Sequence, residues 1–359
     1  MFKKHDPISV QDDPKGTYWR ESSLDSYYRG LPVLVTGGCG FIGSNLVHRL
    51  VELGANVTVI DSLVPGCGWH YANLDGAVDK IRLSFADMRD SAAMRPLVEG
   101  QRIVFNLAGE ISHISSMRDP QRDLNLNASA QLSFLDVCRL HNSSATIVYA
   151  SSRQVYGSAR YLGVDELHPI NPVDYNGVHK LTAEGYHSLL RNQFGVRTIS
   201  LRLGNIYGPR QGIHQDCRGF IDSFMRIALT GGQLVVFGDG TQVRGMLYVD
   251  DAVDAFLRAG AAGPLASAVY NIGNPTPISL IDIARQLARV FDGPEPRTVP
   301  FPEESKAIDI GDFYQNTERA RCELGWAPRV GFEDGLKQTL DFFRPRISER
   351  LHAGTPPIS

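Results

Sequence analysis

The sequence predicts an α/β fold in which a doubly wound parallel sheet is followed by a smaller C-terminal lobe. Two observations lead to this prediction. From Leu31 to Leu203, short runs of apolar and β-branched residues alternate with helical stretches, as in sheets whose strands are joined by crossover helices. Beyond Tyr207 the spacing becomes irregular and rich in proline and glycine, which is typical of a second, smaller lobe.

The first expected strand leads into a glycine-rich turn. Residues 33–36 are apolar or β-branched, and a helix-forming pattern begins within the segment that follows, Gly37-Gly38-Cys39-Gly40-Phe41-Ile42-Gly43. Such a turn needs glycine because a Cβ would keep a pyrophosphate away from the backbone N–H groups at the helix N-terminus. A second strand over 56–60 ends in Asp61, at the spacing expected of a ribose-binding carboxylate. The sequence therefore predicts a Rossmann-type sheet with a dinucleotide site.

Further strands and helices continue the alternation. Strands are expected over 81–85, 102–107, 145–150 and 198–203, and long helices over 125–141 and 177–194. Ligands of parallel sheets bind outside the carboxyl ends of the strands. The segments that we therefore expect to line one crevice are Thr36-Gly37, Asp61, Asp87, Ala108-Gly109 and Ser151-Ser152.

The predicted organisation has four parts. They are an N-terminal extension over 1–30, a dinucleotide-binding domain over 31–205 with some later segments, a substrate-binding lobe mainly over 206–345, and a loose tail over 346–359. In the lobe, helices are expected over 220–229, 249–258, 280–291 and 332–343. The extension carries an aromatic cluster that packs either on the body or on a partner subunit, namely Tyr18, Trp19, Tyr27 and Tyr28.

Composition narrows the class of protein. The formal net charge is −3 and no block of lysine and arginine occurs, which argues against a nucleic-acid partner. No apolar run approaches the ~18 residues that a membrane span requires, so we expect no membrane partner. The five cysteines are scattered without metal-ligand spacing, which favours reduced thiols, a cytoplasmic location and no metal site.

Several short motifs occur in an order that, taken together, is highly specific for one protein family. They are the glycine turn at 36–43, Asp87-Met88-Arg89-Asp90, Asn106-Leu107-Ala108-Gly109, Ser151-Ser152-Arg153-Gln154-Val155-Tyr156-Gly157, the segment 202–210, the segment 237–240, the segment 244–251, and Leu324-Gly325-Trp326 with Pro328. In this order they resemble the extended short-chain dehydrogenase/reductase family, in particular its nucleoside-diphosphate-sugar epimerases and dehydratases. The resemblance covers residues 31–345, which is nearly the whole chain apart from the extension.

The resemblance implies an NAD site. Asp61 would accept hydrogen bonds from the adenosine ribose, and no arginine follows it directly to pair with the 2′-phosphate of NADP. Asp87 and Met88 would lie at the adenine, and Lys180 would hold the nicotinamide ribose. The remaining cofactor residues would be Gly37, Gly40, Phe41, Ile42, Gly43 and Ala108.

The resemblance also implies a nucleoside-diphosphate-sugar site. Ser152 would hold the reacting sugar hydroxyl, with Arg153 beside it. Asn205 would hydrogen-bond the sugar or the diphosphate, and Arg244 would pair with the diphosphate, since a guanidinium fork suits phosphate oxygens. Arg210 is a second diphosphate candidate, and Phe237 would frame the nucleotide base.

One position departs from the family in its catalytic Tyr-x-x-x-Lys pattern. Counting four residues back from Lys180 gives Asn176, and Tyr175 lies one residue too early. Asparagine cannot carry a proton between a hydroxyl and solvent. Three explanations stay open: Tyr175 swings into the role, another acid/base replaces it, or redox chemistry is absent. The candidate replacements are Glu110, His113 and Tyr156.

A second departure concerns the type of reaction. In the 4,6-dehydratases an Asp-Glu pair follows the catalytic Ser/Thr and eliminates water, whereas here Arg153 and Gln154 follow Ser152. An epimerase that works through a keto sugar needs no such pair, so the sequence favours an NAD-dependent epimerase. The alternatives are another lyase with unusual acid/base residues and a binding protein without turnover. The resemblance further suggests a homodimer formed through the helices over 125–141 and 177–194.

Overall fold

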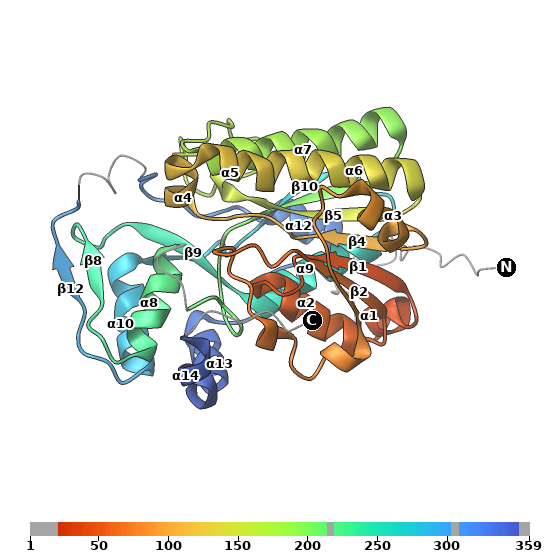
Figure 1. The fold of residues 1–359 in the computed structure, drawn as a ribbon. Coiled ribbons are helices and arrows are strands. Elements are labelled where there is room, and N and C mark those ends of the chain that lie inside the picture. Colours follow the sequence, from red (N-terminus) through yellow and green to blue (C-terminus); the bar gives the residue numbers. More distant parts are fainter. Residues whose placement is uncertain (1–20, 214–218, 303–308, 352–359) are drawn as a thin grey trace.

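A parallel sheet forms the centre of the molecule. The computed structural model describes residues 21–213, 219–302 and 309–351. Seven strands pair in parallel in the order β10-β6-β5-β4-β1-β2-β3 (Figure 1). They are β1 (Pro32–Thr36), β2 (Asn56–Asp61), β3 (Arg82–Phe85), β4 (Ile103–Asn106), β5 (Thr146–Ser152), β6 (Thr198–Leu203) and β10 (Val269–Ile272).

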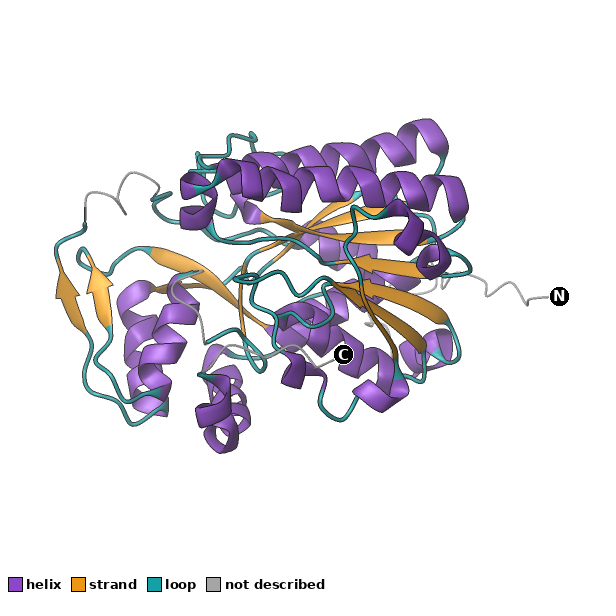
Figure 2. Cartoon of the chain, viewed as in Figure 1, coloured by secondary structure: helices purple, strands orange, loops and turns teal. Residues whose placement is uncertain are grey.

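Helices cover both faces of this sheet (Figure 2). Strand residues alternate between two buried clusters: Val33 and Val35 pack with the residues of α2 and α9, whereas Leu34 packs with those of α3 and α6. The alternation follows from the two-residue period of a strand. The helices of these layers are α1 (Glu21–Tyr28), α2 (Phe41–Glu52), α3 (Ser91–Val98), α6 (Ala130–His141), α7 (Tyr175–Phe194), α9 (Val249–Ala261) and α12 (Glu318–Leu324). The predicted doubly wound Rossmann-type sheet is thus confirmed.

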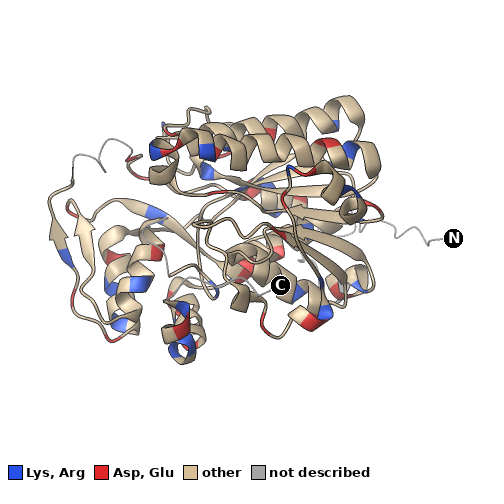
Figure 3. Cartoon of the chain, viewed as in Figure 1, with Lys and Arg blue, Asp and Glu red and all other residues tan. Residues whose placement is uncertain are grey.

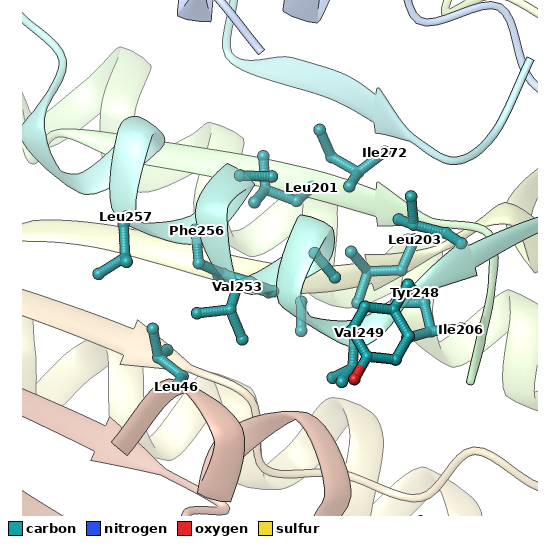
Figure 4. Packing of buried hydrophobic residues seen from close by; sticks show 14 of the residues in the cluster. Leu46, Leu201, Leu203, Ile206, Tyr248, Val249, Val253, Phe256, Leu257 and Ile272 are labelled. Carbon is teal, nitrogen blue, oxygen red and sulfur yellow. The ribbon is translucent and has the colours of Figure 1, made fainter. Parts of the chain in front are cut away.

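Helix α9 packs its buried face against one side of the sheet. Its buried side chains Val253 and Phe256 lie between Leu46 of α2 and the strand residue Leu201 of β6 (Figure 4). Complete burial of such a side chain contributes about 1.5–3 kcal/mol, so this contact layer is a large part of the stability. The helix expected over 249–258 extends to Ala261 in the structure. Residues 259–261 are buried as well.

The smaller lobe, on the left in Figure 1, contains two small sheets and several helices. One sheet consists of β7 (Asn205–Tyr207), β9 (Val243–Tyr248) and β11 (Pro277–Ser279), and the other of β8 (Val235–Phe237) and β12 (Arg297–Val299). The helices are α8 (Phe220–Leu229), α10 (Leu280–Val290) and α13 (Phe332–Phe343). Strand β10 and helix α9 come from this part of the sequence but join the main sheet layer.

Short elements connect these layers. They are η2 (Tyr71–Leu74), η3 (Val78–Lys80), α4 (His113–Arg118), α5 (Pro120–Leu124), η4 (Asn125–Ser129), η5 (Arg153–Tyr156), η6 (Arg344–Arg346) and α14 (Ile347–Arg350). The single long helix expected over 125–141 is wrong in its first turn, because η4 is a π-helix. The wider turn holds Asn127, whose Oδ1 accepts a hydrogen bond from the Glu110 N–H at 3.1 Å.

Both ends of the described chain pack onto the body. Tyr28 is fully buried and its hydroxyl donates to the Leu257 carbonyl oxygen at 2.7 Å, so this part of the aromatic cluster belongs to the body. Arg350 is buried and Nη2 donates to the Ala72 carbonyl oxygen at 2.7 Å. Residues 347–350 form α14, which this contact ties to the body. Tyr18, Trp19 and residues 352–359 lie outside the described residues.

The charged residues do not gather on one face in this view. Figure 3 shows positive and negative residues interspersed over the helices and loops. Among the helices of the described ranges, none combines the length and the apolar character that a membrane crossing requires.

Candidate functional site

One large cavity lies between the carboxyl ends of the main strands and the smaller lobe. Its volume is about 720 Å³. Most residues singled out from the sequence line it: Gly37, Gly40, Phe41, Ile42, Gly43, Asp61, Asp87, Met88, Ala108, His113, Ser152, Arg153, Asn176, Lys180, Asn205, Phe237 and Arg244. Four others do not line it, namely Glu110, Tyr156, Tyr175 and Arg210.

The glycine turn is built without room for side chains. A Cβ on Gly43 would lie 2.2 Å from the Gly37 carbonyl oxygen. Gly37 has a positive φ of 70°, and its Cβ would lie 2.9 Å from the backbone of Ala108. Helix α2 begins directly after Gly40, and no side chain caps its N-terminus. Its first N–H groups thus remain available to an anionic ligand in the cavity.

Asp61 is held in a fixed position at the end of β2. Its Oδ2 accepts a hydrogen bond from the Cys39 N–H and its Oδ1 from the Leu63 N–H, both at 3.0 Å. Burial raises the pKa of this carboxyl, and the two backbone N–H groups oppose that rise. The carboxylate is therefore oriented by the backbone on one side, and the side chain borders the cavity.

Lys180 is a buried cation that borders the cavity. Its exposed fraction is 4%, and its ammonium group makes no hydrogen bond or ion pair with any residue that the structure describes. Burial lowers its pKa from 10.5 to about 8, while the carboxylates of Asp123 and Glu110 act in the opposite direction. A Cβ on Gly109, in the loop after β4, would lie 2.6 Å from Asn127 Oδ1 and 2.9 Å from Lys180 Nζ, so glycine leaves room for both side chains.

Asn176 occupies the position one helical turn before Lys180. It is fully buried, and its Nδ2 donates to the Glu110 carbonyl oxygen at 3.0 Å and to Asp123 Oδ2 at 2.8 Å. Its Oδ1 is buried and has no hydrogen-bond partner. Tyr175 is 44% exposed and its ring stacks on His179, so it lies on the outer side of α7. Asn176 thus stands at the cavity wall where the family carries a phenol.

His113 is the one candidate replacement that borders the cavity. Its Nδ1 makes a short hydrogen bond to Oδ2 of Asp174, a carboxylate that is almost fully buried. Its Nε2 lies 2.5 Å from Gln154 Nε2, which requires the ring nitrogen to accept and the amide to donate. Although burial acts to raise the pKa of Asp174, hydrogen bonds from His113 and Gly177 hold that pKa below its ordinary value.

The other two candidates lie in buried polar clusters. Glu110 accepts hydrogen bonds from two backbone N–H groups and lies 3.5 Å from Arg122 Nη1. The Tyr156 hydroxyl donates to Asn271 Oδ1 at 2.7 Å and accepts from Arg202 at 2.9 Å. Both side chains are therefore engaged away from the cavity.

The lobe side of the cavity carries two guanidinium groups. Arg153 Nε donates to Asn205 Oδ1 at 3.3 Å. Arg244 lies on β9, and its Nη1 donates to the carbonyl oxygens of Val243 and Gly311 at 2.9 and 2.6 Å. Phe237 is 40% exposed and its ring lies 5.7 Å from that of Phe301, which also borders the cavity.

Arg210 lies apart from this site. It has a positive φ of 67°, Nη1 donates to Asn45 Oδ1 at 2.8 Å, and its guanidinium carbon lies 5.2 Å from the centre of the Phe342 ring. Its place as a diphosphate ligand is not supported by this geometry.

Comparison with known proteins identifies the family. Residues 33–273 match the model of the NAD dependent epimerase/dehydratase family. The chain belongs to this family. It is 32% identical over 314 residues to the UDP-glucose 4-epimerase of Mycolicibacterium smegmatis, a match that covers 87% of this chain and 98% of that protein.

Solved structures of similar proteins agree with the fold and the cofactor. The UDP-glucose 4-epimerase of Thermotoga maritima with UDP-glucose superposes with a TM-score of 0.80 at 29% identity, covering 88% of this chain and all of that one. The Thermus thermophilus UDP-glucose 4-epimerase complex with NAD gives a TM-score of 0.77 at 28% identity, with the same coverage of 88% and 100%. The family is NAD-dependent, which confirms the predicted cofactor.

The described residues fit NAD. The uncapped helix N-terminus after Gly40 suits a pyrophosphate, and the backbone-anchored Asp61 suits ribose hydroxyls. Lys180 brings a buried ammonium that lies 5.8 Å from the centre of the Tyr149 ring and makes no hydrogen bond or ion pair within the described ranges, and the nicotinamide ribose hydroxyls would satisfy it. The individual residue roles remain predictions.

Replacing Asp61 with alanine should weaken NAD binding. Loss of hydrogen bonds to a charged acceptor corresponds to about 1.5–3 kcal/mol, or roughly a 10- to 150-fold higher Kd for NAD. Calorimetric titration of the cofactor-free protein with NAD and with NADP measures this. The parent protein should prefer NAD, and equal affinity for both cofactors would contradict the role given to Asp61.

Two residues that contribute to the site did not stand out in the sequence. Asp174 caps α7 by accepting a hydrogen bond from the Gly177 N–H and also binds His113, and Asp123 links Asn176 with His179. The only sequence signal for Asp174 is its place as an N-cap residue before a helix. Nothing in the sequence marks Asp123, because its partners are supplied by a different helix.

Proposed function

We propose that the chain is a nucleotide-sugar epimerase that oxidises one sugar hydroxyl to a ketone and reduces it again on the opposite face. The observation that carries this proposal is the single cavity that joins the glycine turn and Asp61 to Ser152, Lys180 and Arg244. A cofactor and a sugar held at its two ends would meet at the carboxyl end of β5. The NAD cofactor, when bound, supplies hydride transfer.

His113 is the acid/base in this proposal. Ser152 Oγ accepts the Gln154 N–H at 3.2 Å, which leaves its own O–H free to orient the reacting sugar oxygen. His113 Nε2 takes the proton of the sugar hydroxyl and later returns it, and the sugar hydroxyl displaces the Gln154 amide at that nitrogen. The Asp174 carboxylate holds the ring by its Nδ1–H and stabilises the imidazolium.

Asn176 and Lys180 keep supporting roles. Asn176 borders the cavity with its amide nitrogen held by Glu110 and Asp123, and Lys180 provides positive charge near the developing alkoxide. A dehydratase is less well supported because Arg153 and Gln154, which follow Ser152, include no carboxyl group.

Incubation with a panel of nucleotide sugars tests the proposal. UDP-glucose, UDP-N-acetylglucosamine and UDP-glucuronate are mixed with NAD-loaded protein and followed by NMR of the anomeric proton. At least one should equilibrate with an epimer of the same mass. Loss of water or of carbon dioxide would favour the lyase alternative, and binding without any conversion would favour the non-catalytic one.

We infer that the protein forms a homodimer through α6 and α7. These helices pack side by side and expose apolar side chains, among them Leu132 and Leu140 on α6 and Val178 and Leu189 on α7. On the same stripe of α7, a Cβ on Gly185 would meet no atom within 4 Å, which leaves space for close approach of another helix. Such a pair of helices would form a four-helix interface with its copy.

Replacing Leu132 and Leu189 together with aspartate should give a monomer. Both side chains are about half exposed in the single chain, so the double variant should still fold. Light scattering at micromolar concentration measures the mass. The matched control is Leu167→Asp, since Leu167 is 80% exposed on a turn outside both helices and should leave the dimer intact. A monomeric parent protein would contradict the inference.

A further inference from the structure

Arg153 is a cation without a counter-ion at the sugar end of the cavity. Among the described residues, its buried Nη1 has no hydrogen-bond partner, its Nε donates to the neutral amide of Asn205, and its guanidinium carbon lies 5.3 Å from the centre of the Phe313 ring. Within the described ranges, no carboxylate lies within 4.0 Å of its guanidinium nitrogens. Burial, and then the neighbouring Arg244, lower its pKa, so the site disfavours this charge as it stands.

The carboxylates nearest to Arg153 are already engaged. Asp174 binds His113 and caps α7, and Asp309 accepts from Gln242 Nε2 at 2.7 Å and lies 3.7 Å from Arg244 Nη2. Two buried arginines of the main sheet layer, in contrast, each have a carboxylate partner. Arg202 is paired with Glu184 at 2.7 Å and Arg258 with Asp254 at 2.7 Å. Arg153 is thus a half-buried cation at the cavity wall that has no carboxylate partner among the described residues, so a ligand carboxylate would compensate its charge.

The position of Arg153 points to the sugar rather than to the nucleotide. Arg153 follows Ser152 directly. The Ser152 hydroxyl oxygen accepts a hydrogen bond from the Gln154 N–H and so caps the short helix η5 that begins at Arg153. Because Ser152 holds the reacting sugar hydroxyl in the proposed function and Arg153 borders the same cavity, the guanidinium would lie near the sugar ring. A neutral sugar brings no charge to this point, whereas a carboxylate would match the planar fork of arginine with two parallel hydrogen bonds.

We propose that Arg153 selects nucleotide sugars that carry a carboxylate, that is, uronic acid sugars. This proposal rests on the proposed function and adds the substrate class to it. The Arg153 fork binds the sugar carboxylate, and Asn205 holds the guanidinium in the plane required for that contact. Arg244 remains the cation for the diphosphate.

Binding to three ligands tests the proposal independently of turnover. Calorimetric titration of the NAD-loaded protein with UDP, UDP-glucose and UDP-glucuronate should show UDP-glucuronate binding at least about tenfold more tightly than UDP-glucose, as expected for charge-assisted hydrogen bonds. In Arg153→Gln this preference should disappear, while the affinities for UDP and UDP-glucose should change by less than about threefold. Arg153→Lys should retain part of the preference because it keeps the charge but loses the fork.

Two results would overturn the proposal. The first is equal affinity of the parent protein for UDP-glucose and UDP-glucuronate. The second is an Arg153→Gln variant that loses UDP and UDP-glucose as strongly as UDP-glucuronate, which would make Arg153 a diphosphate ligand. Thermal melting of Arg153→Gln shows whether the variant is folded, and its melting temperature should change little because the variant loses a long hydrogen bond and a ring contact but no ion pair. If UDP-glucose is epimerised without any preference for the uronate, only this proposal fails; if no nucleotide sugar binds, the proposed function fails with it.

Discussion

Replacement of His113 with asparagine should lower kcat for epimerisation by about 10²–10⁴-fold, the usual contribution of a general acid/base. The affinities for NAD and for the nucleotide sugar should change little, because only the ring that carries the proton is lost. Steady-state kinetics with the best sugar of the panel measures kcat, and quenching of protein fluorescence on cofactor addition shows that the site is intact.

Tyr175→Phe is the matched control for this experiment. Tyr175 lies on the exposed side of α7, so removal of its hydroxyl should leave kcat within about twofold of the parent value. Asp174→Asn should fall between the two variants, because it leaves the imidazole in place but changes which ring nitrogen carries the proton. A large loss in Tyr175→Phe together with a silent His113→Asn would contradict the assignment of His113 and restore the tyrosine.

Replacement of Lys180 with methionine should have opposite effects on activity and stability. Activity should fall by at least about a hundredfold, because the variant lacks the charge that stabilises a developing alkoxide in a buried site. The cofactor-free protein should become more stable by an amount on the order of 3 kcal/mol, since burial moves the pKa of this lysine from 10.5 to about 8. Denaturant unfolding of the protein after removal of NAD measures the stability.

The stability difference should depend on pH in a defined direction. Below pH 8 the lysine is charged in both the folded and unfolded states, and the folded protein bears the full cost of burying that charge. Between pH 8 and 10.5 the unfolded state binds more protons, so the parent protein gains stability as pH rises and the advantage of Lys180→Met shrinks. A stability difference that does not change across this range would show that Lys180 is not a buried charge in solution.

The sheet was predictable because its signals are local. Six of its strands coincide with apolar and β-branched runs, and the helices between them show the spacing of a buried face. Strand β10 did not stand out, because four residues within an irregular stretch carry no periodic signal and pair with β6 only through the tertiary fold. The π-helical turn of η4 did not stand out either, because its five residues carry no local signal that separates i→i+5 from i→i+4 hydrogen bonding.

The site was predictable only in part. The residues at the carboxyl ends of the strands follow from the topology, which brings the glycine turn, Asp61 and Ser152 to one edge. The partner of His113 does not follow, because Asp174 lies 61 residues away and meets it only across a loop and a helix end. The sequence also could not distinguish the engaged Glu110 and Tyr156 from the cavity-facing His113, since all three occur in motifs near strand ends.

The labelling of an epimerised sugar in deuterated water tests the central claim most directly. The NAD-loaded protein is incubated with the nucleotide sugar that it converts, and the product is analysed by NMR and mass spectrometry. Oxidation to a ketone and return of the same hydrogen on the other face predicts an inverted carbon that carries no solvent deuterium, in a product of unchanged mass. Solvent deuterium at the inverted carbon would contradict this mechanism, because it would show that inversion proceeds by removal and return of a proton.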